Sequence, residues 1–429
     1  MKYESWFKKV LCLFECIIVF FFFTWSSTFS VVAIWLRKYV GLDGADTGVI
    51  FSCISIVALC AQPLYGFMQD KLGLRKNLLL FIAVLLIASG PFFMVFGTLL
   101  KWNVFLGSAI GGLFIGMTFH AGIGVLESYT ERVSRLRNFE YGKARMWGSL
   151  GWATATFFAG RNINVNPDYN FIMATVSGLL FLVILLKLKT ANTDAYNSLE
   201  HGKPSTITVK DALQLFVQPQ FWALILFVLG TCIYSVYDQQ FMVYFAHQFQ
   251  NEQLGNEMYG YLNSLQVFLE AGGMFLAPFI VNRIGAKNGL LFASSVMALR
   301  IIGSGLVDGA IMISIMKLLH AVELPILLVA IFKYNSLHFD KRLSSTLYLV
   351  GFSCMSSVVA SILSPLAGWG YDQIGFAHTY LVMGGFVIIT TILSAFCLRG
   401  DGTGNQEIGS KDQRNKFDKD HSDNLVVKV

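Results

Sequence analysis

Long apolar runs constrain this 429-residue chain more than any other feature of its sequence. Twelve runs are close to or above the length of about 20 residues that an α-helix needs to cross a membrane. They lie at 10–36, 46–69, 77–100, 103–128, 144–162, 170–187, 220–246, 258–281, 288–307, 309–332, 343–369 and 376–398. With 55% hydrophobic and only 14% charged residues, the composition excludes a soluble enzyme, a nucleic-acid-binding protein and a disordered scaffold. The sequence predicts an all-α membrane protein with twelve transmembrane helices.

The twelve runs fall into two groups of six, separated by the longest internal polar stretch. We expect an N-terminal six-helix half at 1–187, a cytoplasmic linker at 188–219 and a C-terminal six-helix half at 220–398. The charged, glycine-rich end at 399–429 is predicted to be a disordered cytoplasmic tail. The first run is too long for the apolar segment of a signal peptide, so we interpret it as the first span.

Lysine and arginine are distributed unevenly between the two sides of this bundle. If the N-terminus is cytoplasmic, 25 of these residues fall on the cytoplasmic side and four on the opposite side. The four are Arg37, Lys38, Lys101 and Arg161, and the remaining three of the 32 lie within spans. Such an excess predicts that both termini are cytoplasmic.

A short internal repeat indicates that the two halves are related. The segment DKLGLRKNLLL (Asp70–Leu80) aligns with NRIGAKNGLLF (Asn282–Phe292) at an offset of 212 residues, which places Arg75 on Lys287. Both segments lie between the second and third spans of their half. We therefore expect two parallel six-helix halves.

Ionisable side chains inside the spans of the second half are the strongest functional signal. A charge at the centre of a bilayer costs at least about 2.5 to 3.5 kcal/mol, so such residues are retained for pairing or for function. There are six: Asp238, Glu270, Arg300, Lys317, His320 and Glu323. Three acids face two obligate bases and one histidine, which leaves one acid over.

An unpaired carboxyl in a dry site holds its proton and releases it when water or a cation approaches, so the extra acid indicates a proton carrier. We expect Glu323 to fill this role, because its neighbours are the most apolar and Pro325 interrupts the helical hydrogen bonds nearby. We also expect an ion pair between Asp238 and Lys317. The alternative is a set of static ion pairs that only fix the packing of the helices.

The first half offers fewer such groups. Glu127 and Arg145 have opposite charges and can pair, either at the membrane interface or in a site. Trp152 is an ordinary aromatic of the bundle or a platform for a sugar ring. The seven cysteines lie in or beside apolar runs without metal-ligand spacing, so we expect no metal site.

Several motifs resemble those of one transporter family. They are GFMQDKLGLRK, LESYTERVSRLRNFEYGKARMWGSLGWA, YDQQF, LNSLQVFLEA, NRIGAKN, ALRIIGS, KLLHAVELP and FDKRLSSTLYLVGF. The chain is similar, from about residue 14 to 398, to the oligosaccharide:proton symporters of the major facilitator superfamily. The resemblance implies a twelve-helix bundle in the bacterial inner membrane that takes up a sugar with a proton by alternating access.

The resemblance also implies roles for individual residues. Glu127 and Arg145 match the family's sugar-binding carboxylate and guanidinium, and Trp152 matches the aromatic on which the sugar stacks. Glu270 and His320 are expected to contact the rest of the substrate. The coupling network is matched by Tyr234, Asp238, Arg300, Lys317, His320 and Glu323, with Glu323 at the proton-carrying position.

Departures from the lactose-type pattern bear on the substrate. Where that pattern has an Asp and a Lys in spans seven and eleven, this chain has Ser235 and Ser356. The lactose-type acid of span eight falls at Val267, and Glu270 lies one helical turn later. These changes favour sucrose or a sucrose-containing oligosaccharide as the substrate. Glu127 and Trp152, in contrast, match residues of galactoside transporters, so lactose, melibiose and raffinose are alternative substrates.

Other readings of the sequence are weaker. A passive sugar facilitator would not need an acidic residue in excess of the basic ones inside its spans. A membrane sensor would need a tail with an apolar pattern through which to bind a partner protein, and this tail has none. We expect a monomer whose ligands are a sugar and a proton, with no cofactor, no nucleic acid and no enzymatic activity.

Overall fold

The computed structural model describes residues 2–72, 75–137, 141–188, 217–339, 352 and 354–401. Every regular element within these ranges is a helix, which confirms the all-α prediction. The predicted linker and tail lie almost wholly outside the described residues, as does the beginning of the run predicted at 343–369.

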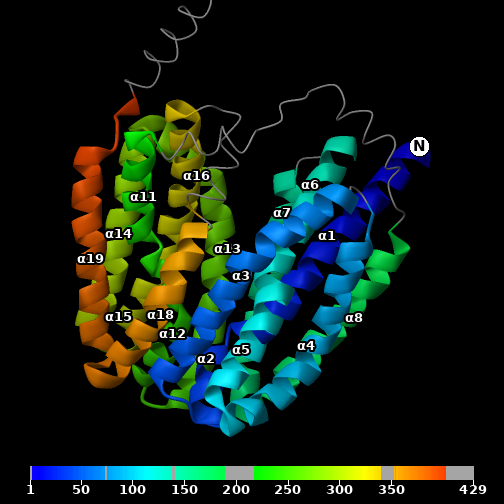
Figure 1. The fold of residues 1–429 in the computed structure, drawn as a ribbon, viewed down its shortest axis with the longest axis horizontal. Coiled ribbons are helices and arrows are strands. Elements are labelled where there is room, and N and C mark those ends of the chain that lie inside the picture. The colour runs from blue at the N-terminus through cyan, green and yellow to red at the C-terminus, as the bar shows by residue number, and fades with distance from the viewer. Residues whose placement is uncertain are drawn as a thin grey trace, which may run out of the picture.

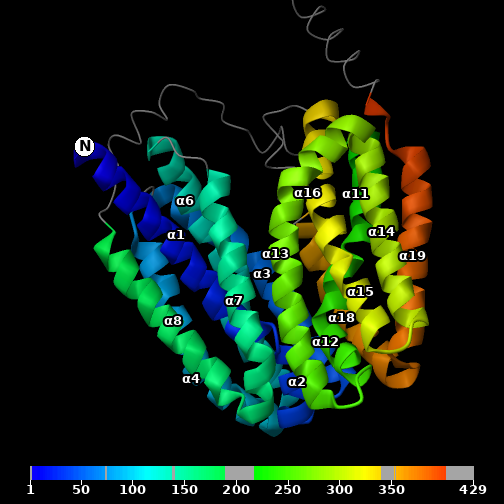
Figure 2. The same cartoon turned by 180° about the vertical axis from the view of Figure 1, so that it is seen from behind.

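Two groups of helices stand beside each other (Figures 1 and 2). The first contains α1 (Lys2–Phe29), α2 (Val32–Trp35), η1 (Leu36–Val40), α3 (Gly44–Leu72), α4 (Asn77–Trp102), α5 (Val104–Ile115), η2 (Gly116–Ala121), α6 (Gly122–Arg137), α7 (Tyr141–Val165) and α8 (Asp168–Lys187). The second contains α11 (Pro219–Thr231), α12 (Ile233–His247), α13 (Glu252–Ile284), α14 (Ala286–Leu306), α15 (Ala310–Leu318), α16 (His320–His338), α18 (Met355–Gln373) and α19 (Gly375–Cys397).

Ten helical stretches of the described chain are long and apolar enough to cross a membrane. Large apolar side chains point outward from them: Phe396 is 84% exposed and Phe105 is 77% exposed, as expected for surfaces that face lipid. The helices α7 and α18 are not among the ten, and α7 carries Arg145 and Arg161 within its length. Twelve spans therefore stay a prediction.

Two interruptions in the helices lie beside predicted site residues. The π-helix η2 ends at Ala121 and leads directly into α6, which begins five residues before Glu127. The second interruption separates α15 from α16 at Leu319, between Lys317 and His320. Pro325 follows inside α16 and has no N–H to donate to the preceding turn. Irregular turns of this kind are frequent at functional sites because they turn side chains away from the regular helical face.

The two groups of helices meet at the end of the molecule opposite Lys2 (Figure 1). There, the backbone N–H groups of Gly44 and Ala45, which begin α3, donate to the carboxylate of Asp372 on α18 at 3.0 and 2.8 Å. Along α7 and α13, Asn256 Nδ2 donates to Asn164 Oδ1 at 2.9 Å. These bonds join elements of opposite halves.

Close backbone contacts accompany these bonds. A Cβ atom added to Gly48 would lie 2.3 Å from the carbonyl oxygen of Ser364, and one added to Gly160 would lie 2.4 Å from that of Asn256. Only glycine allows helices to approach this closely. The two halves are therefore sealed at this end by contacts between backbones.

In each half, a lysine of the repeated basic segment donates hydrogen bonds to backbone carbonyls at the end of the last helix of that half. Lys76 Nζ donates to the carbonyls of Leu185 and Leu188, which end α8, at 3.0 and 2.6 Å. Lys287 Nζ donates to the carbonyl of Leu398, just after α19, at 2.7 Å. A cation suits the negative end of a helix. Lys76, the neighbour of the aligned Arg75, thus makes the contact in the first half that Lys287 makes in the second.

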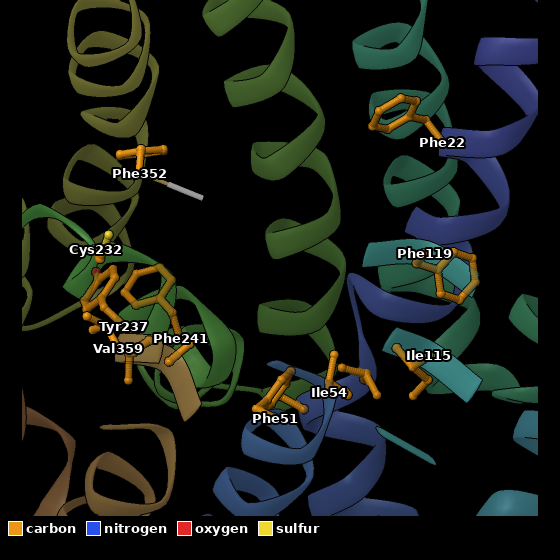
Figure 3. Packing of buried hydrophobic residues seen from close by; sticks show 14 of the residues in the cluster. Phe22, Phe51, Ile54, Ile115, Phe119, Cys232, Tyr237, Phe241, Phe352 and Val359 are labelled. Carbon is orange, nitrogen blue, oxygen red and sulfur yellow. The ribbon is translucent and has the colours of Figure 1, made fainter. Parts of the chain in front are cut away.

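Buried apolar side chains fill both halves of the molecule (Figure 3). Phe22 and Phe119 pack in the first half, and Tyr237 and Phe241 pack in the second, with ring centroids of the latter two 4.9 Å apart. The buried residues of the two halves belong to one apolar cluster of the described chain.

Candidate functional site

The first-half wall of the candidate site is built by α6 and α7. Arg145 Nε lies 2.6 Å from Glu127 Oε1, so the two predicted sugar-binding residues form an ion pair. The guanidinium also lies over the ring of Phe22, with Cζ 4.4 Å from the centroid. Both charged side chains are about one-third exposed, so the pair is only partly shielded from solvent.

Trp152 lies seven residues after Arg145 and therefore on the same face of α7. Its ring meets that of Trp25 edge to face at a centroid distance of 5.4 Å, and Ser26 Oγ donates to its backbone carbonyl at 2.9 Å. The packing against α1 fixes the indole, and both Trp152 and Arg145 border the central cavity.

The second-half wall contains a buried network centred on Arg300 of α14, which is 1% exposed. Its Nη1 lies 2.9 Å from Asp238 Oδ1 on α12, and its Nη2 lies 2.7 Å from Glu323 Oε1 on α16. The guanidinium also lies over the ring of Tyr237, at 4.7 Å from the centroid. One cation thus joins two carboxylates from two different helices.

Glu323 is fully buried, and its two oxygens have different surroundings. Oε1 accepts from both Arg300 and His320 Nδ1, the latter at 2.8 Å. Oε2 has no hydrogen-bond partner among the described residues. Because a carboxylate oxygen can only accept, His320 carries its proton on Nδ1. A proton placed on Oε2 would leave both existing hydrogen bonds intact.

Lys317 does not form the expected ion pair with Asp238. Its ammonium donates instead to Asn263 Oδ1 at 2.9 Å and to Gln266 Oε1 at 3.0 Å, and it lies 4.3 Å from the ring centroid of Tyr259. Asp238 takes Arg300 as its partner, because Arg300 offers two N–H groups to the two carboxylate oxygens.

A cavity of about 330 Å³ lies between the two walls. Arg145, Trp152, Asp238, Glu270, Lys317 and His320 are among the residues that border it. The other four predicted site residues do not border it, but each contacts one that does: Glu127 pairs with Arg145, Arg300 with Asp238, Glu323 with His320, and the Tyr234 ring lies 5.8 Å from that of His320.

Several polar residues that the sequence analysis did not assign to the site also border the cavity. Asn263 and Gln266 on α13 and Ser235 on α12 all border it. The first two precede Glu270 by seven and four residues, so a helical face with three polar side chains inside an apolar span was a usable signal. Ser235 Oγ donates to the Cys232 carbonyl at 2.8 Å, which satisfies its hydroxyl group.

The arrangement suits a neutral, hydroxyl-rich ligand. The cavity is bordered by the guanidinium of Arg145, the ammonium of Lys317, the amides of Asn263 and Gln266, and the ring of Trp152. It is also bordered by the carboxylate of Glu270, which has no hydrogen bond or ion pair in the described chain. Cavities of this size with a few placed polar groups bind small molecules. The Arg300 network lies directly behind the cavity, where a change in its charge would be felt by the ligand.

Comparisons with known proteins identify the family of the chain. The family model described as LacY proton/sugar symporter matches residues 5–408. The chain is 43% identical over 382 residues to a raffinose permease of Escherichia coli, covering 88% of this chain and 90% of the relative. It is 44% identical over 383 residues to a melibiose permease of Enterobacter cloacae, with the same coverage of both chains.

Solved structures show the fold. A crystal structure of the nucleoside transporter NupG superimposes with a TM-score of 0.74 at 14% identity, covering 90% of this chain and 98% of that one. The likeness in fold, the match to the family model and the identity to the two permeases all extend over most of the chain. The chain therefore belongs to the family of LacY proton/sugar symporters, and it is a multi-pass membrane permease rather than an enzyme.

Proposed function

We propose that this protein takes up a sucrose-containing oligosaccharide together with a proton, by alternating access. The proposal includes twelve spans in two six-helix halves, 1–187 and 220–398, with a cytoplasmic linker at 188–219, both termini in the cytoplasm and the bacterial inner membrane as its location. The lysine and arginine distribution supports the orientation, and the parallel use of Lys76 and Lys287 supports the division into halves.

The observation that carries the proposal is the Arg300 network beside the cavity. Glu323 shares one oxygen with Arg300 and His320 and keeps the other without a partner. In the carboxylate form, the charge of Glu323 is stabilised by Arg300. In the protonated form, Arg300 keeps Asp238 as its ion-pair partner. The buried site therefore accommodates both the ionised and the protonated form of Glu323, as a proton carrier requires.

Coupling follows because His320 belongs to both the network and the cavity. Its Nδ1 donates to Glu323, while its ring borders the space in which the sugar would lie. A sugar hydroxyl on His320 alters the hydrogen bond that His320 gives to Glu323. The ligand and the proton thus act on the same side chain, which makes the binding of each depend on the other.

The contacts between the halves support alternating access. The backbone contacts of Gly48 and Gly160 and the bond from α3 to Asp372 seal the end opposite Lys2. With the proposed orientation this is the outer face. Opening there requires these contacts to separate while the two halves move relative to each other.

The two walls of the cavity differ in character, and this supports the substrate class. The first-half wall, with Arg145 and Trp152, resembles that of galactoside permeases. The second-half wall, with Val267 and Glu270, resembles that of sucrose permeases. Raffinose is a galactose linked to a sucrose unit, so it presents one part to each wall. We propose raffinose as the first substrate to test, and sucrose as the second.

A galactoside without fructose is the competing candidate. The pairing of Arg145 with Glu127 and the fixed ring of Trp152 favour it, because these groups need only the galactosyl part. Melibiose is the galactosyl-glucose part of raffinose and therefore separates the two possibilities.

Uptake into proteoliposomes tests the proposal. Radiolabelled raffinose, sucrose, melibiose and lactose are supplied separately, with and without an inward proton gradient. We expect raffinose or sucrose to accumulate only with the gradient, and a protonophore to abolish the accumulation. Accumulation of melibiose or lactose alone would contradict the substrate, and equal uptake without a gradient would contradict proton coupling.

A further inference from the structure

Lys317 has surroundings that the coupling network does not explain. It is 4% exposed and borders the cavity, yet its hydrogen-bond acceptors are the neutral amide oxygens of Asn263 and Gln266. In the part of the chain that the structure describes, its ammonium contacts no carboxylate. A buried cation without an anionic partner is costly, so its retention calls for a functional reason.

The two amides hold the ammonium in one place. Asn263 Nδ2 donates to Thr156 Oγ1 on α7 at 3.2 Å, which leaves its Oδ1 to accept from Lys317. The orientation of this amide is thus set from both sides, because a lysine ammonium can only donate. The ring of Tyr259, 4.3 Å from Nζ, adds a cation–π contact.

The ammonium has one donor more than the amides can take. Of its three N–H groups, two are used by Asn263 and Gln266. The third has no hydrogen-bond acceptor among the described residues, and the side chain lines the cavity. An oxygen of a sugar hydroxyl is an acceptor that a neutral substrate brings to this point.

We propose that Lys317 is a specificity-determining residue that donates a hydrogen bond to a hydroxyl of the sugar, and that Asn263 and Gln266 are the positioning residues that hold it for this purpose. The inference rests on the proposed sugar uptake and assigns Lys317 to the substrate rather than to the proton. Asn263 also bonds to Thr156, which connects the position of Lys317 to the contact between α7 and α13.

Equilibrium binding separates this role from a role in coupling. Raffinose, sucrose, melibiose and lactose are titrated one at a time into purified protein by calorimetry. For each sugar that the wild type binds, we expect Lys317→Met to raise Kd about ten- to a hundredfold, the loss typical of one charge-assisted hydrogen bond. At saturating sugar, the ratio of gradient-driven uptake to sugar exchange should stay at the wild-type value.

Variants of the amides test the positioning role. Asn263→Ser should raise Kd in the wild-type background and add nothing in the Lys317→Met background, because its effect passes through the lysine. Asn256→Ser is the matched control: Asn256 also bonds to α7, at Asn164, but does not contact Lys317. Its effect should be the same in both backgrounds.

Each result decides the matter. An unchanged Kd in Lys317→Met with loss of gradient-driven uptake would place Lys317 in the proton network and refute the inference. Equal effects of Asn263→Ser in both backgrounds would show that this residue acts through helix packing. Lys317→Arg, which keeps the donors, should bind more tightly than Lys317→Met, and the opposite order would also refute it. A wild type that binds and transports none of the four sugars would overturn the proposed function itself, a result distinct from all of these.

Discussion

A single methyl group on α3 should open the sealed end of the molecule. In Gly48→Ala the new Cβ would lie 2.3 Å from the Ser364 carbonyl oxygen and 2.8 Å from Pro365 Cα. Ordinary van der Waals contact begins at 3.4 Å, so α3 and α18 must separate by about 1 Å. Both contacting atoms belong to backbone, which cannot move aside as a flexible side chain can.

The size of the effect follows from the cost of overpacking. Crowding of this kind costs about 1 to 3 kcal/mol, and it acts only on the state in which α3 and α18 touch. At 1.4 kcal/mol per factor of ten, the ratio of the open to the sealed state should rise about 5- to 150-fold. Alanine is a better helix former than glycine by roughly 1 kcal/mol, so the helix itself is not weakened.

Thiol labelling measures this ratio. Ser30 borders the cavity, and a Ser30→Cys probe is introduced after the seven native cysteines, all of them free thiols, have been replaced by serine. A membrane-impermeant maleimide is added to right-side-out vesicles, so that it reaches the probe only through the outer face. The labelling rate then reports how often that face opens.

Gly66 supplies the matched control on the same helix. A Cβ added there meets nothing within 4 Å, so Gly66→Ala should label at the unmodified rate. Equal labelling rates in Gly48→Ala and Gly66→Ala would refute the idea that backbone contact seals this end.

Three further predictions concern single carboxyl groups. Glu323→Gln should abolish gradient-driven sugar uptake but spare exchange, because an amide cannot release a proton; equal loss of both activities in proteoliposomes would contradict this. Glu270→Gln should raise the sugar Kd roughly tenfold, measured by calorimetry, since a charged acceptor is lost from the cavity; an unchanged Kd would remove Glu270 from the sugar site. Asp372→Asn should increase labelling of the Ser30→Cys probe about two- to fivefold, because a charge at the start of α3 is lost; unchanged labelling would count against this contact.

Much of the fold was predictable from the sequence because the bilayer imposes simple demands. Backbone groups must pair within each segment, so apolar runs of sufficient length become helices whatever their neighbours are. Ten of the runs correspond to helical stretches that meet this condition in the structure. The same logic singled out the charged residues, since a charge inside an apolar run stands out without knowledge of its partner.

The partners themselves were not predictable. Counting charges suggested that Asp238 pairs with Lys317, whereas the structure pairs Asp238 with Arg300 and places Lys317 on two amides. The count contains no distances: Glu323, expected to be the unpaired acid, lies 2.7 Å from Arg300, and Glu270 is the acid without an ion pair in the described chain. A change of a few ångströms between helices decides which cation a carboxylate meets.

Sequence alone therefore determined the membrane class, the family resemblance and the residues worth attention, because hydropathy and motifs are read along the chain. Only the tertiary structure decided that Arg300 joins Asp238 to Glu323, that Asn263 and Gln266 belong to the site, and that glycines seal one end. These facts depend on how helices rotate and approach one another, which is set by packing over whole interfaces rather than by any local stretch of residues.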